Sequence, residues 1–217
     1  MKKTLFISIS CVILSCSINK KFKESPEVLS KIIKESDLSE VEVTIVNNFL
    51  DIELKKDKYK NYKGYPICIV KEAIGKSTPI IIYEYCYNSR DLPIKISTNK
   101  DWILNEKQIK QIKDTLINSR IHHWETLDFK GLNASIIEYE DLKKSIKENN
   151  YLKYSKTLIL NLSIPLIINK NSAFISFTSN EGSFGYSTID RFMVLLKKNK
   201  EDKWEIDSYY YNPNSAW

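Results

Sequence analysis

The stretch "KTLILNLSIPLIINKNSAFISFTS", residues 156–179, indicates the fold most directly. Two runs rich in aliphatic, β-branched and aromatic residues flank the polar turn "NKN", a composition that favours β-strands joined by a tight connection. Two further runs, "RFMVLLKK" and "WEIDSYYYN", follow after the polar or glycine-bearing separators "NEGSFGYS" and "NKEDK". The end of the chain is therefore predicted to be an antiparallel β-meander.

Helix signals dominate the first half of the chain. Ser39 precedes an apolar stripe of helical period and has Glu42 three residues on, which is the pattern of a capping box. Asn105 and Gln108 repeat the pattern before a second stripe. A weaker signal predicts a helix in "SPEVLSKIIKE", "DLKKSIKEN" is predicted to be a short helix or a turn, and "ASIIEY" is predicted to be a short strand. The sequence predicts an α+β fold, with helices mainly in the first half and an antiparallel β-sheet at the C-terminal end.

Two cysteines lie in a region predicted to be a β-hairpin. "ICIV" and "PIIIYEYCYN" have strand composition, and a five-residue loop at 75–79 would place Cys68 opposite Cys86. Directly opposed residues lie within the distance that a disulfide spans. In the alternative interpretation "KEAIGK" forms a helical turn, which breaks this register and leaves two buried thiols.

The N-terminus has the pattern of a secretory signal. A short basic segment precedes the apolar run "TLFISISCVIL", which is too short to span a bilayer. The run ends in "ILSC", residues 13–16, which resembles the lipobox of bacterial lipoproteins. The resemblance implies lipidation at Cys16 and cleavage before it; an ordinary cleaved signal is the alternative. We expect a signal peptide at 1–15, a lipidated tether at 16–25 and one α+β domain, with room for two lobes, at 26–217.

This resemblance also implies a cellular location. The protein would be held in the bacterial cell envelope by its lipid anchor. Ser17 is not the aspartate that retains many lipoproteins in the inner membrane of Gram-negative bacteria. The outer membrane is therefore favoured if the source is Gram-negative.

The last sixty residues resemble a pattern in uncharacterised bacterial lipoproteins. The shared features are a Ser-x-Pro strand, a strand opening on a small residue, a glycine-bearing loop and a strand begun by tryptophan, represented here by Ser163, Pro165, Ala173, Gly182, Gly185 and Trp204. The closing strand is also similar to that of cone-shaped domains of the nuclear transport factor 2 type. Neither resemblance implies an activity, because a fold hosts many functions.

Few residues are candidates for chemistry. His122 and His123 are the only histidines, and their adjacency makes them a poor pair for one metal ion. One of them with Glu125 and Asp128 could bind a metal, but a surface or helix-end histidine is favoured. Serines 89, 163 and 183 lack a nucleophile elbow, and a solvated strand face explains Glu138 and Glu140 as well as catalysis does. We predict no catalytic, cofactor or metal residue.

Three functions remain open. The leading hypothesis is a non-enzymatic domain that binds an envelope protein or other envelope ligand. An envelope hydrolase acting on glycan or peptide is the second. The third is a glycan or small-molecule binder with a tyrosine-lined pocket, built from Tyr83, Tyr85 and Tyr87 on one strand face or from the run 209–211. The net charge of +6 is spread along the chain, and an envelope address argues against nucleic acid as a partner.

Overall fold

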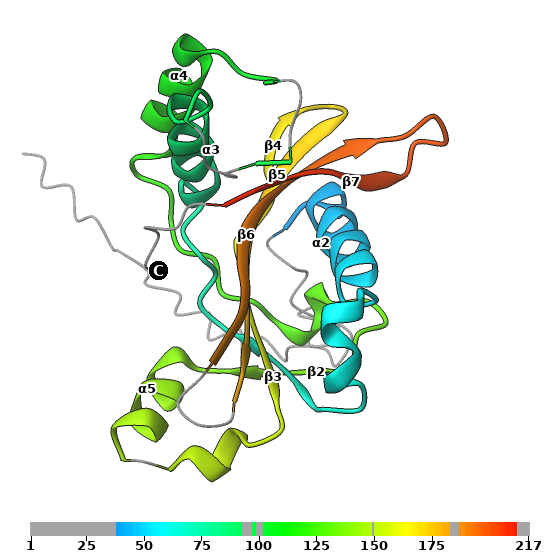
Figure 1. Cartoon of the computed structure of the whole chain (residues 1–217), viewed down its shortest axis with the longest axis vertical. Coiled ribbons are helices and arrows are strands. Elements are labelled where there is room, and N and C mark those ends of the chain that lie inside the picture. The colour runs from blue at the N-terminus through cyan, green and yellow to red at the C-terminus, as the bar shows by residue number, and fades with distance from the viewer. Residues whose placement is uncertain (1–37, 93–96, 99–101, 149, 183–186, 212–217) are drawn as a thin grey trace, which may run out of the picture. The chain divides into compact units, whose positions relative to one another are not determined.

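A mixed sheet of seven strands runs through the part of the chain that the structure describes, and helices lie on both of its faces (Figure 1). The computed structural model describes residues 38–92, 97–98, 102–148, 150–182 and 187–211. Its helices are α2 (Glu40–Glu53), η1 (Asp57–Tyr62), α3 (Thr78–Asn88), α4 (Glu106–Leu116), η2 (Thr126–Asp128), α5 (Tyr139–Lys147) and η3 (Tyr151–Tyr154), where η denotes a 3₁₀ helix. The strands are β1 (Ile67–Val70), β2 (Ala134–Ile137), β3 (Leu158–Leu162), β4 (Leu166–Asn169), β5 (Ser172–Glu181), β6 (Ser187–Lys198) and β7 (Trp204–Tyr210). The α+β class is confirmed.

The order of the strands combines two kinds of pairing. It is β2-β1-β3-β5-β6-β7, and β4 pairs with β5 off this path. The predicted antiparallel meander is present as β5, β6 and β7. The sequence analysis did not predict that β1 lies parallel to both β2 and β3. Parallel neighbours need long connections, and here these carry the helices.

The Ser-x-Pro feature divides one predicted strand into β3 and β4. Pro165 has no N–H and cannot donate to a ladder. Just before it, the backbone N–H of Ser163 donates to the carbonyl of Ser176 at 2.9 Å. The return bond, from the backbone N–H of Ser176, goes to the Ser163 hydroxyl at 2.9 Å. The serine side chain thus accepts the bond as the chain bends toward the proline.

Gly182, at the end of β5, allows two backbones to approach closely. A Cβ built there would lie 2.0 Å from the carbonyl oxygen of Tyr154. The backbone N–H of Gly182 donates to the carbonyl of Thr157 at 2.9 Å. Close contact between the two backbones explains the glycine at this position. Gly185 lies outside the described residues.

Two predicted helix starts are confirmed. Ser39 and Glu42 form a reciprocal capping box at α2, and Asn105 and Gln108 form one at α4. The predicted strand "ICIV" is β1, "ASIIEY" contains β2, and "DLKKSIKEN" lies largely in α5. The helix predicted in "SPEVLSKIIKE", the signal peptide and the tether lie outside the described residues.

The strand predicted over "PIIIYEYCYN" is wrong, because this segment is the helix α3. Pro79 lies in its first turn, where a missing N–H costs nothing. Ile80, Tyr83 and Cys86 are fully buried at helical spacing, in one cluster with residues of β5 and β6. Packing against the sheet therefore outweighs the strand propensity of the isoleucines and tyrosines.

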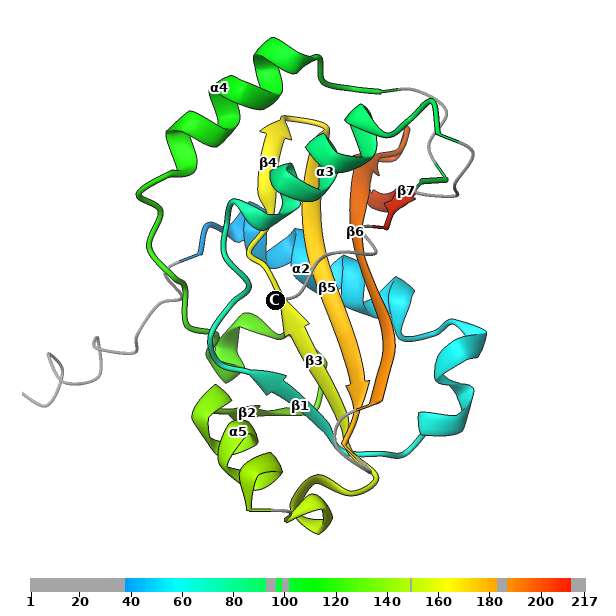
Figure 2. The ribbon, with the colours of Figure 1, turned by 60° about the vertical axis from the view of Figure 1, so that its left-hand side comes forward.

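The two faces of the sheet are covered differently. On one face, α2 and η1 pack over a large core that includes Phe49, Phe177 and Phe192. On the other face, α3 and α4 cover one end and α5 covers the opposite end, each over its own apolar cluster. Figure 2 shows α3 and α4 at one end of the sheet and α5 at the other end, beside β1 and β2. A pocket opens on this face beside α5.

Candidate functional site

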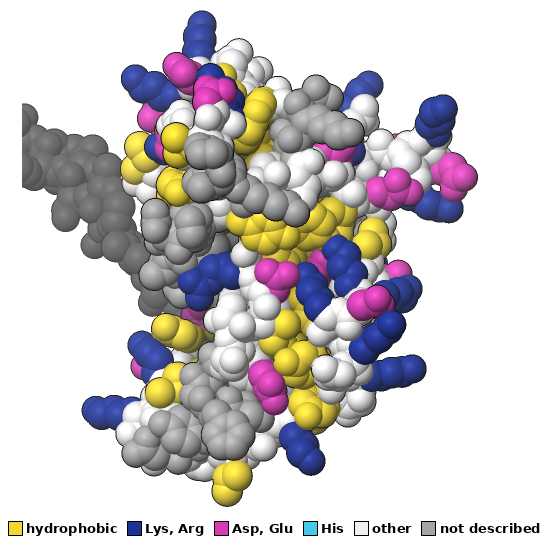
Figure 3. Space-filling view, in the orientation of Figure 1, with side chains coloured by type: hydrophobic (Ala, Val, Ile, Leu, Met, Phe, Trp, Pro, Cys, Tyr) yellow, Lys and Arg dark blue, Asp and Glu magenta, His cyan; other side chains and the backbone are white. Residues whose placement is uncertain are grey.

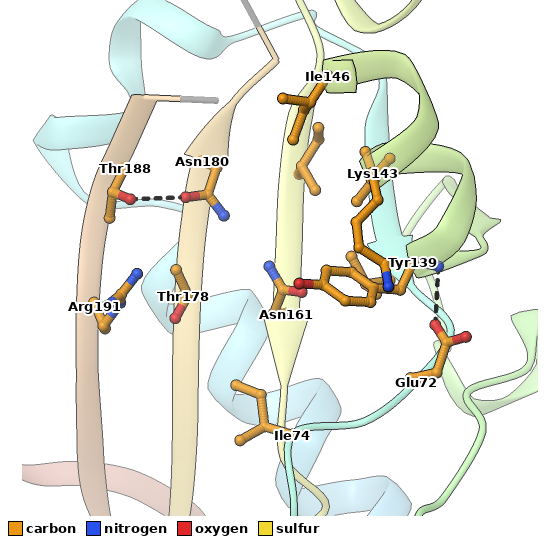
Figure 4. Close-up of a pocket in the computed structure, with 13 residues that line it drawn as sticks. Glu72, Ile74, Tyr139, Lys143, Ile146, Asn161, Thr178, Asn180, Thr188 and Arg191 are labelled. Carbon is orange, nitrogen blue, oxygen red and sulfur yellow. Dashed lines mark hydrogen bonds between the residues drawn. The ribbon is translucent and has the colours of Figure 1, made fainter. Parts of the chain in front are cut away.

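A row of polar side chains crosses the second face in a pocket beside α5. Asn161 on β3 is the register partner of Thr178 on β5, which is the partner of Arg191 on β6. Register partners lie on the same side of a sheet, so the three side chains form one line across three strands. Figure 4 shows them side by side, with the Tyr139 ring reaching over from α5 toward Asn161. The row joins an amide, a hydroxyl and a guanidinium.

A second polar pair extends this row toward the end of the strands. Asn180 and Thr188 are register partners on β5 and β6. The Thr188 hydroxyl donates to the Asn180 side-chain oxygen at 3.0 Å (Figure 4). A register shift between Ser179 and Asn180 separates this pair from the Thr178–Arg191 pair. The floor is polar along both strands.

The wall of the pocket is apolar. Leu142 and Ile146 of α5 face Val70, Ile159 and Ile74 across the opening. Together with the polar floor they enclose a volume of about 400 Å³. Cavities that hold small molecules measure about 300–1,000 Å³ and combine apolar walls with a few placed polar groups. This pocket has that size and that mixture.

Two more charged residues line the pocket, and both are engaged by α5. The Glu72 carboxylate accepts a 3.0 Å bond from the backbone N–H of Tyr139, in the first turn of the helix. An acid at this position also interacts favourably with the helix dipole. The Lys143 ammonium is paired with Glu140, and this bond raises the pKa of Lys143.

The opposite face of the sheet also carries polar groups, but these groups are bonded to one another. Glu53 at the end of α2 is fully buried and lies 2.5 Å from the Lys58 ammonium and 2.8 Å from the Tyr209 hydroxyl. Lys58 also pairs with Asp190 at 2.5 Å. Burial lowers the pKa of Lys58, but the bonds to both acids outweigh it and leave the pKa raised. Figure 3 shows an apolar band in the middle of its view, with basic side chains gathered beside it on the side of α2.

The fold brings together only some of the candidate catalytic and metal-binding residues. His122 lies with its Nε2 3.6 Å from an Asp128 carboxylate oxygen, and its ring packs edge-on against Trp124. That same oxygen accepts a 2.8 Å bond from the backbone N–H of Glu125, so Asp128 also holds the local turn. His123 is exposed. Among the described residues, no group of three or more His, Cys, Asp or Glu side chains could hold a metal ion.

The paired carboxylates Glu138 and Glu140 do not share a strand face as we expected. They lie at the N-terminus of α5, where Glu138 pairs with Lys71 and Glu140 with Lys143. Of the three serines, Ser89 caps the end of α3, Ser163 is buried at the strand break, and residue 183 lies outside the described residues.

The tyrosines do not form one surface. Tyr83 belongs to α3 and is fully buried, its ring is stacked near that of Tyr87, and its hydroxyl accepts a bond from the backbone N–H of Leu104. Tyr210 is buried on the same face of the sheet. Tyr209 and Tyr211 pack on the opposite face. The tyrosine-lined pocket that the sequence suggested is therefore not supported by the placement of these side chains.

The predicted hairpin, and with it the geometric argument for a disulfide, fails. Cys68 lies in β1 beneath α5, and Cys86 lies in α3 within the other cluster on that face. Both are buried thiols that form no disulfide. Burial raises the pKa of both, that of Cys86 to about 12. The proposed lipid acceptor Cys16 lies outside the described residues.

Sequence reasoning missed the pocket floor. Its signal was present as Asn161 in the apolar run "LILNL" and as Thr178 and Asn180, which are two positions apart in "FTSNE". Alternation shows that such residues share a face. It does not show whether a helix covers that face.

Comparisons with protein-family models, with curated proteins and with solved structures give no match to this chain. Within the described ranges, no helix has both the length and the apolar character that crossing a bilayer requires.

Proposed function

We propose that this chain is a lipid-anchored protein of the bacterial envelope whose folded domain binds a small ligand in the pocket between α5 and the sheet. The observation that carries the proposal is the pocket itself. Its polar floor and apolar wall are the combination that fixes and buries small molecules. The domain would then be a binding module held at the membrane rather than an enzyme.

The ligand-binding part is tested by filling the pocket. Ile146 lies on its rim with a side chain 41% exposed, so Ile146→Trp adds bulk to the opening with little strain in the core. Leu152→Trp is the matched control, because Leu152 is 85% exposed and does not line the pocket. Native mass spectrometry of protein purified from membranes should show a small-molecule adduct on the parent chain and on Leu152→Trp. An adduct retained by Ile146→Trp would place the ligand elsewhere.

The anchor rests on "ILSC" behind a short apolar run. Thioether attachment and acylation give more than one buried chain, which holds a protein stably on a bilayer. Radiolabelled palmitate should enter the parent chain and be absent from Cys16→Ser. Cys11→Ser, which removes the other cysteine of the leader, should still be labelled. Label in Cys16→Ser would contradict the lipoprotein assignment.

One observation favours a second candidate, the envelope hydrolase. His122 beside the buried Asp128 has the arrangement of a general base with an orienting acid. Replacing His122 and His123 together by alanine should leave ligand binding unchanged if the binding proposal is right. Loss of an envelope-hydrolysing activity, with the fold retained by circular dichroism, would favour the hydrolase instead.

A further inference from the structure

A side-chain amide is the most open polar group of the pocket beside α5. Asn161 on β3 is half-buried, and within the described ranges no group of the protein forms a hydrogen bond with its amide (Figure 4). Neither its nitrogen nor its oxygen is buried, so both atoms are open to a ligand. An amide offers two donors on its nitrogen and an acceptor on its oxygen. Asn161 can therefore bond a head group that both accepts and donates.

Asn180 adds a second amide to the same face of the sheet. It lies two positions from Thr178, the register partner of Asn161, so the two asparagines are diagonal neighbours on β3 and β5. The Asn180 side-chain oxygen accepts the Thr188 hydroxyl at 3.0 Å, which leaves the nitrogen of this amide to donate. Thr178 itself is buried, and we assign it no contact with the ligand. The floor therefore presents uncharged donors and an uncharged acceptor.

The charged residues of the lining have counterparts within the protein. The Glu72 carboxylate accepts a 3.0 Å bond from the backbone N–H of Tyr139. The Lys143 ammonium, which is bonded to Glu140, also attracts the Glu72 carboxylate. Arg191 has interactions of its own with other groups of the chain. A charged ligand would meet like charge as well as opposite charge here, and burying a charge without a partner is costly. An uncharged head group avoids this cost.

The rest of the lining is aliphatic. Val70, Leu142 and Ile159 are buried side chains of the wall, and Ile146 stands at the rim, 41% exposed. An apolar group placed against them leaves water, which is favourable in proportion to the area buried. The ligand should therefore carry an apolar body beside its polar group.

We propose that the pocket takes a small uncharged amphiphile, whose head group both donates and accepts hydrogen bonds at Asn161 and whose apolar body packs against α5. This inference rests on the proposed function. Carboxamides and hydroxyls share this head-group chemistry. It occurs in free amphiphiles and in uncharged lipids of a bilayer. The volume of about 400 Å³ suits one medium-length chain rather than a two-chain lipid taken up whole.

The test compares three probes that share an eight-carbon chain and differ in charge. Octanamide, octanoate and octylammonium are titrated at pH 7, below their micelle-forming concentrations, into the full chain carrying Cys16→Ser, with binding measured by calorimetry. Octanamide should bind at least tenfold more tightly than either charged probe. Octanoate is nearly the same shape as octanamide, so this pair isolates the effect of the charge.

Variants of Asn161 test the contact itself. Asn161→Leu should weaken binding of octanamide at least fivefold. Asn118→Leu, at an exposed asparagine outside the pocket, is the matched control and should change nothing. Asn161→Asp places a carboxylate of similar size at the same position and should shift the preference toward octylammonium. Octanamide binding that is unchanged in Asn161→Leu would overturn the contact that defines this inference.

The remaining outcomes separate this inference from the pocket function. Binding of octanoate or octylammonium as tight as that of octanamide, abolished by Ile146→Trp, would overturn the uncharged head group and leave the pocket function standing. If Asn161→Leu fails to fold, the three probes on the parent chain and on Asn161→Asp still decide.

A last arm distinguishes the two sources of the head group. Phosphatidylcholine vesicles are offered with and without a glucosyl diacylglycerol. Binding only to the vesicles with the glucolipid, and not to octanamide, would assign the head group to a bilayer lipid, whereas binding of octanamide would assign a free amphiphile. Binding of neither would overturn the inference, while the adduct lost in Ile146→Trp decides the pocket function separately.

Discussion

Strands β5 and β6 present two polar pairs, one on each face of the sheet, and the pairs have opposite environments. Ser179 and Asp190 face α2 and η1, while Thr178 and Arg191, one residue away on each strand, face the pocket. On the α2 face Ser179 is bonded to Tyr59 and Asp190 to Lys58. On the other face the pair lines a cavity.

This difference distinguishes polar residues that complete a core from those that line a pocket. Under α2 the network is closed by residues of three elements, because Glu53 comes from α2, Lys58 from η1 and Tyr209 from β7. Each buried polar group there has a partner of opposite charge or matching donor. On the pocket side, α5 contributes Leu142 and Ile146 to the lining, together with Tyr139 and Lys143. The α2 face should therefore be sensitive to polar deletions that the pocket face tolerates.

The largest effect is expected from Glu53→Ala. It leaves Lys56 and Lys58 without their buried acid and opens a cavity at the end of α2. Removing one partner of a buried ion pair costs about 3 kcal/mol of unfolding free energy. Urea denaturation followed by circular dichroism measures the loss.

Asp51→Ala is the matched control for Glu53→Ala, because it removes the same charge from the same helix. Asp51 pairs with Lys55, and both side chains are mostly exposed. Such pairs contribute less than about 1 kcal/mol. Equal losses of unfolding free energy in the two variants would show that the buried Glu53 network contributes no more to stability than an exposed ion pair.

A smaller effect should appear with pH at Cys86, beneath the covered end of the pocket face. Burial raises the pKa of this thiol to about 12 in the folded state, from 9.0 for an ordinary thiol. Above pH 9 the unfolded chain loses this proton while the folded chain keeps it, so the thiol's contribution to stability falls as pH rises. From pH 8 to pH 10 the parent chain should lose about 1.4 kcal/mol of unfolding free energy relative to Cys86→Ala.

Comparing the parent chain with Cys86→Ala cancels the contribution of the tyrosines that titrate in the same pH range. A constant difference between them from pH 8 to pH 10 would mean that water reaches Cys86. The covered end would then resemble the pocket more than the closed α2 face. Alkylation offers an independent check, since the folded thiol should react far more slowly at pH 8 than the thiol in urea.

Tyr59→Phe should have an effect of about 1 kcal/mol, because it removes the hydroxyl that bonds to Ser179 at 2.9 Å between two buried side chains. Tyr139→Phe removes a hydroxyl from a half-exposed side chain on the pocket rim and should leave the unfolding free energy unchanged. Thermal unfolding of both variants measures the contrast. A larger loss of unfolding free energy in Tyr139→Phe than in Tyr59→Phe would show that the polar groups on the pocket side, rather than those on the α2 side, stabilise the fold.

The elements of this fold that depend on residues close together in the sequence could be predicted from the sequence. The capping boxes at Ser39 and Asn105 depend on residues three positions apart, so they predicted α2 and α4 correctly. The polar turns of the meander are equally local. Segment 79–88 was misread because Tyr83, Tyr85 and Tyr87 alternate like a strand, while the helical spacing of its buried residues is set by contact with the sheet.

The pocket depended on non-local facts. Alternation in β3 and β5 assigns Asn161 and Thr178 to a face, but the position of Arg191 beside them follows from a register between strands. Whether that face is covered depends on where α5 docks, which in turn depends on the parallel pairing of β1 with β2 and β3. None of these contacts is encoded within a short window of sequence.

The smallest effect is expected from Asn161→Leu. Asn161 is half-buried in the middle of β3, between Leu160 and Leu162, which face the α2 core. Leucine has a similar size, and replacing a partly desolvated amide by an apolar group of like shape is close to neutral. The unfolding free energy should change by less than about 0.5 kcal/mol, within the range of substitutions that break no closed network.

Ser163→Ala is the contrast at the end of the same strand. Its hydroxyl accepts the backbone N–H of Ser176, and losing it leaves that buried N–H without an acceptor, at a cost of about 1–2 kcal/mol. Urea denaturation of the two variants in parallel decides the point. If Asn161→Leu loses as much stability as Ser163→Ala, the amide is part of a closed structural network, and the row Asn161–Thr178–Arg191 would be built like the α2 face rather than for a ligand. If stability is retained while the small-molecule adduct seen by native mass spectrometry is lost, Asn161 serves the pocket.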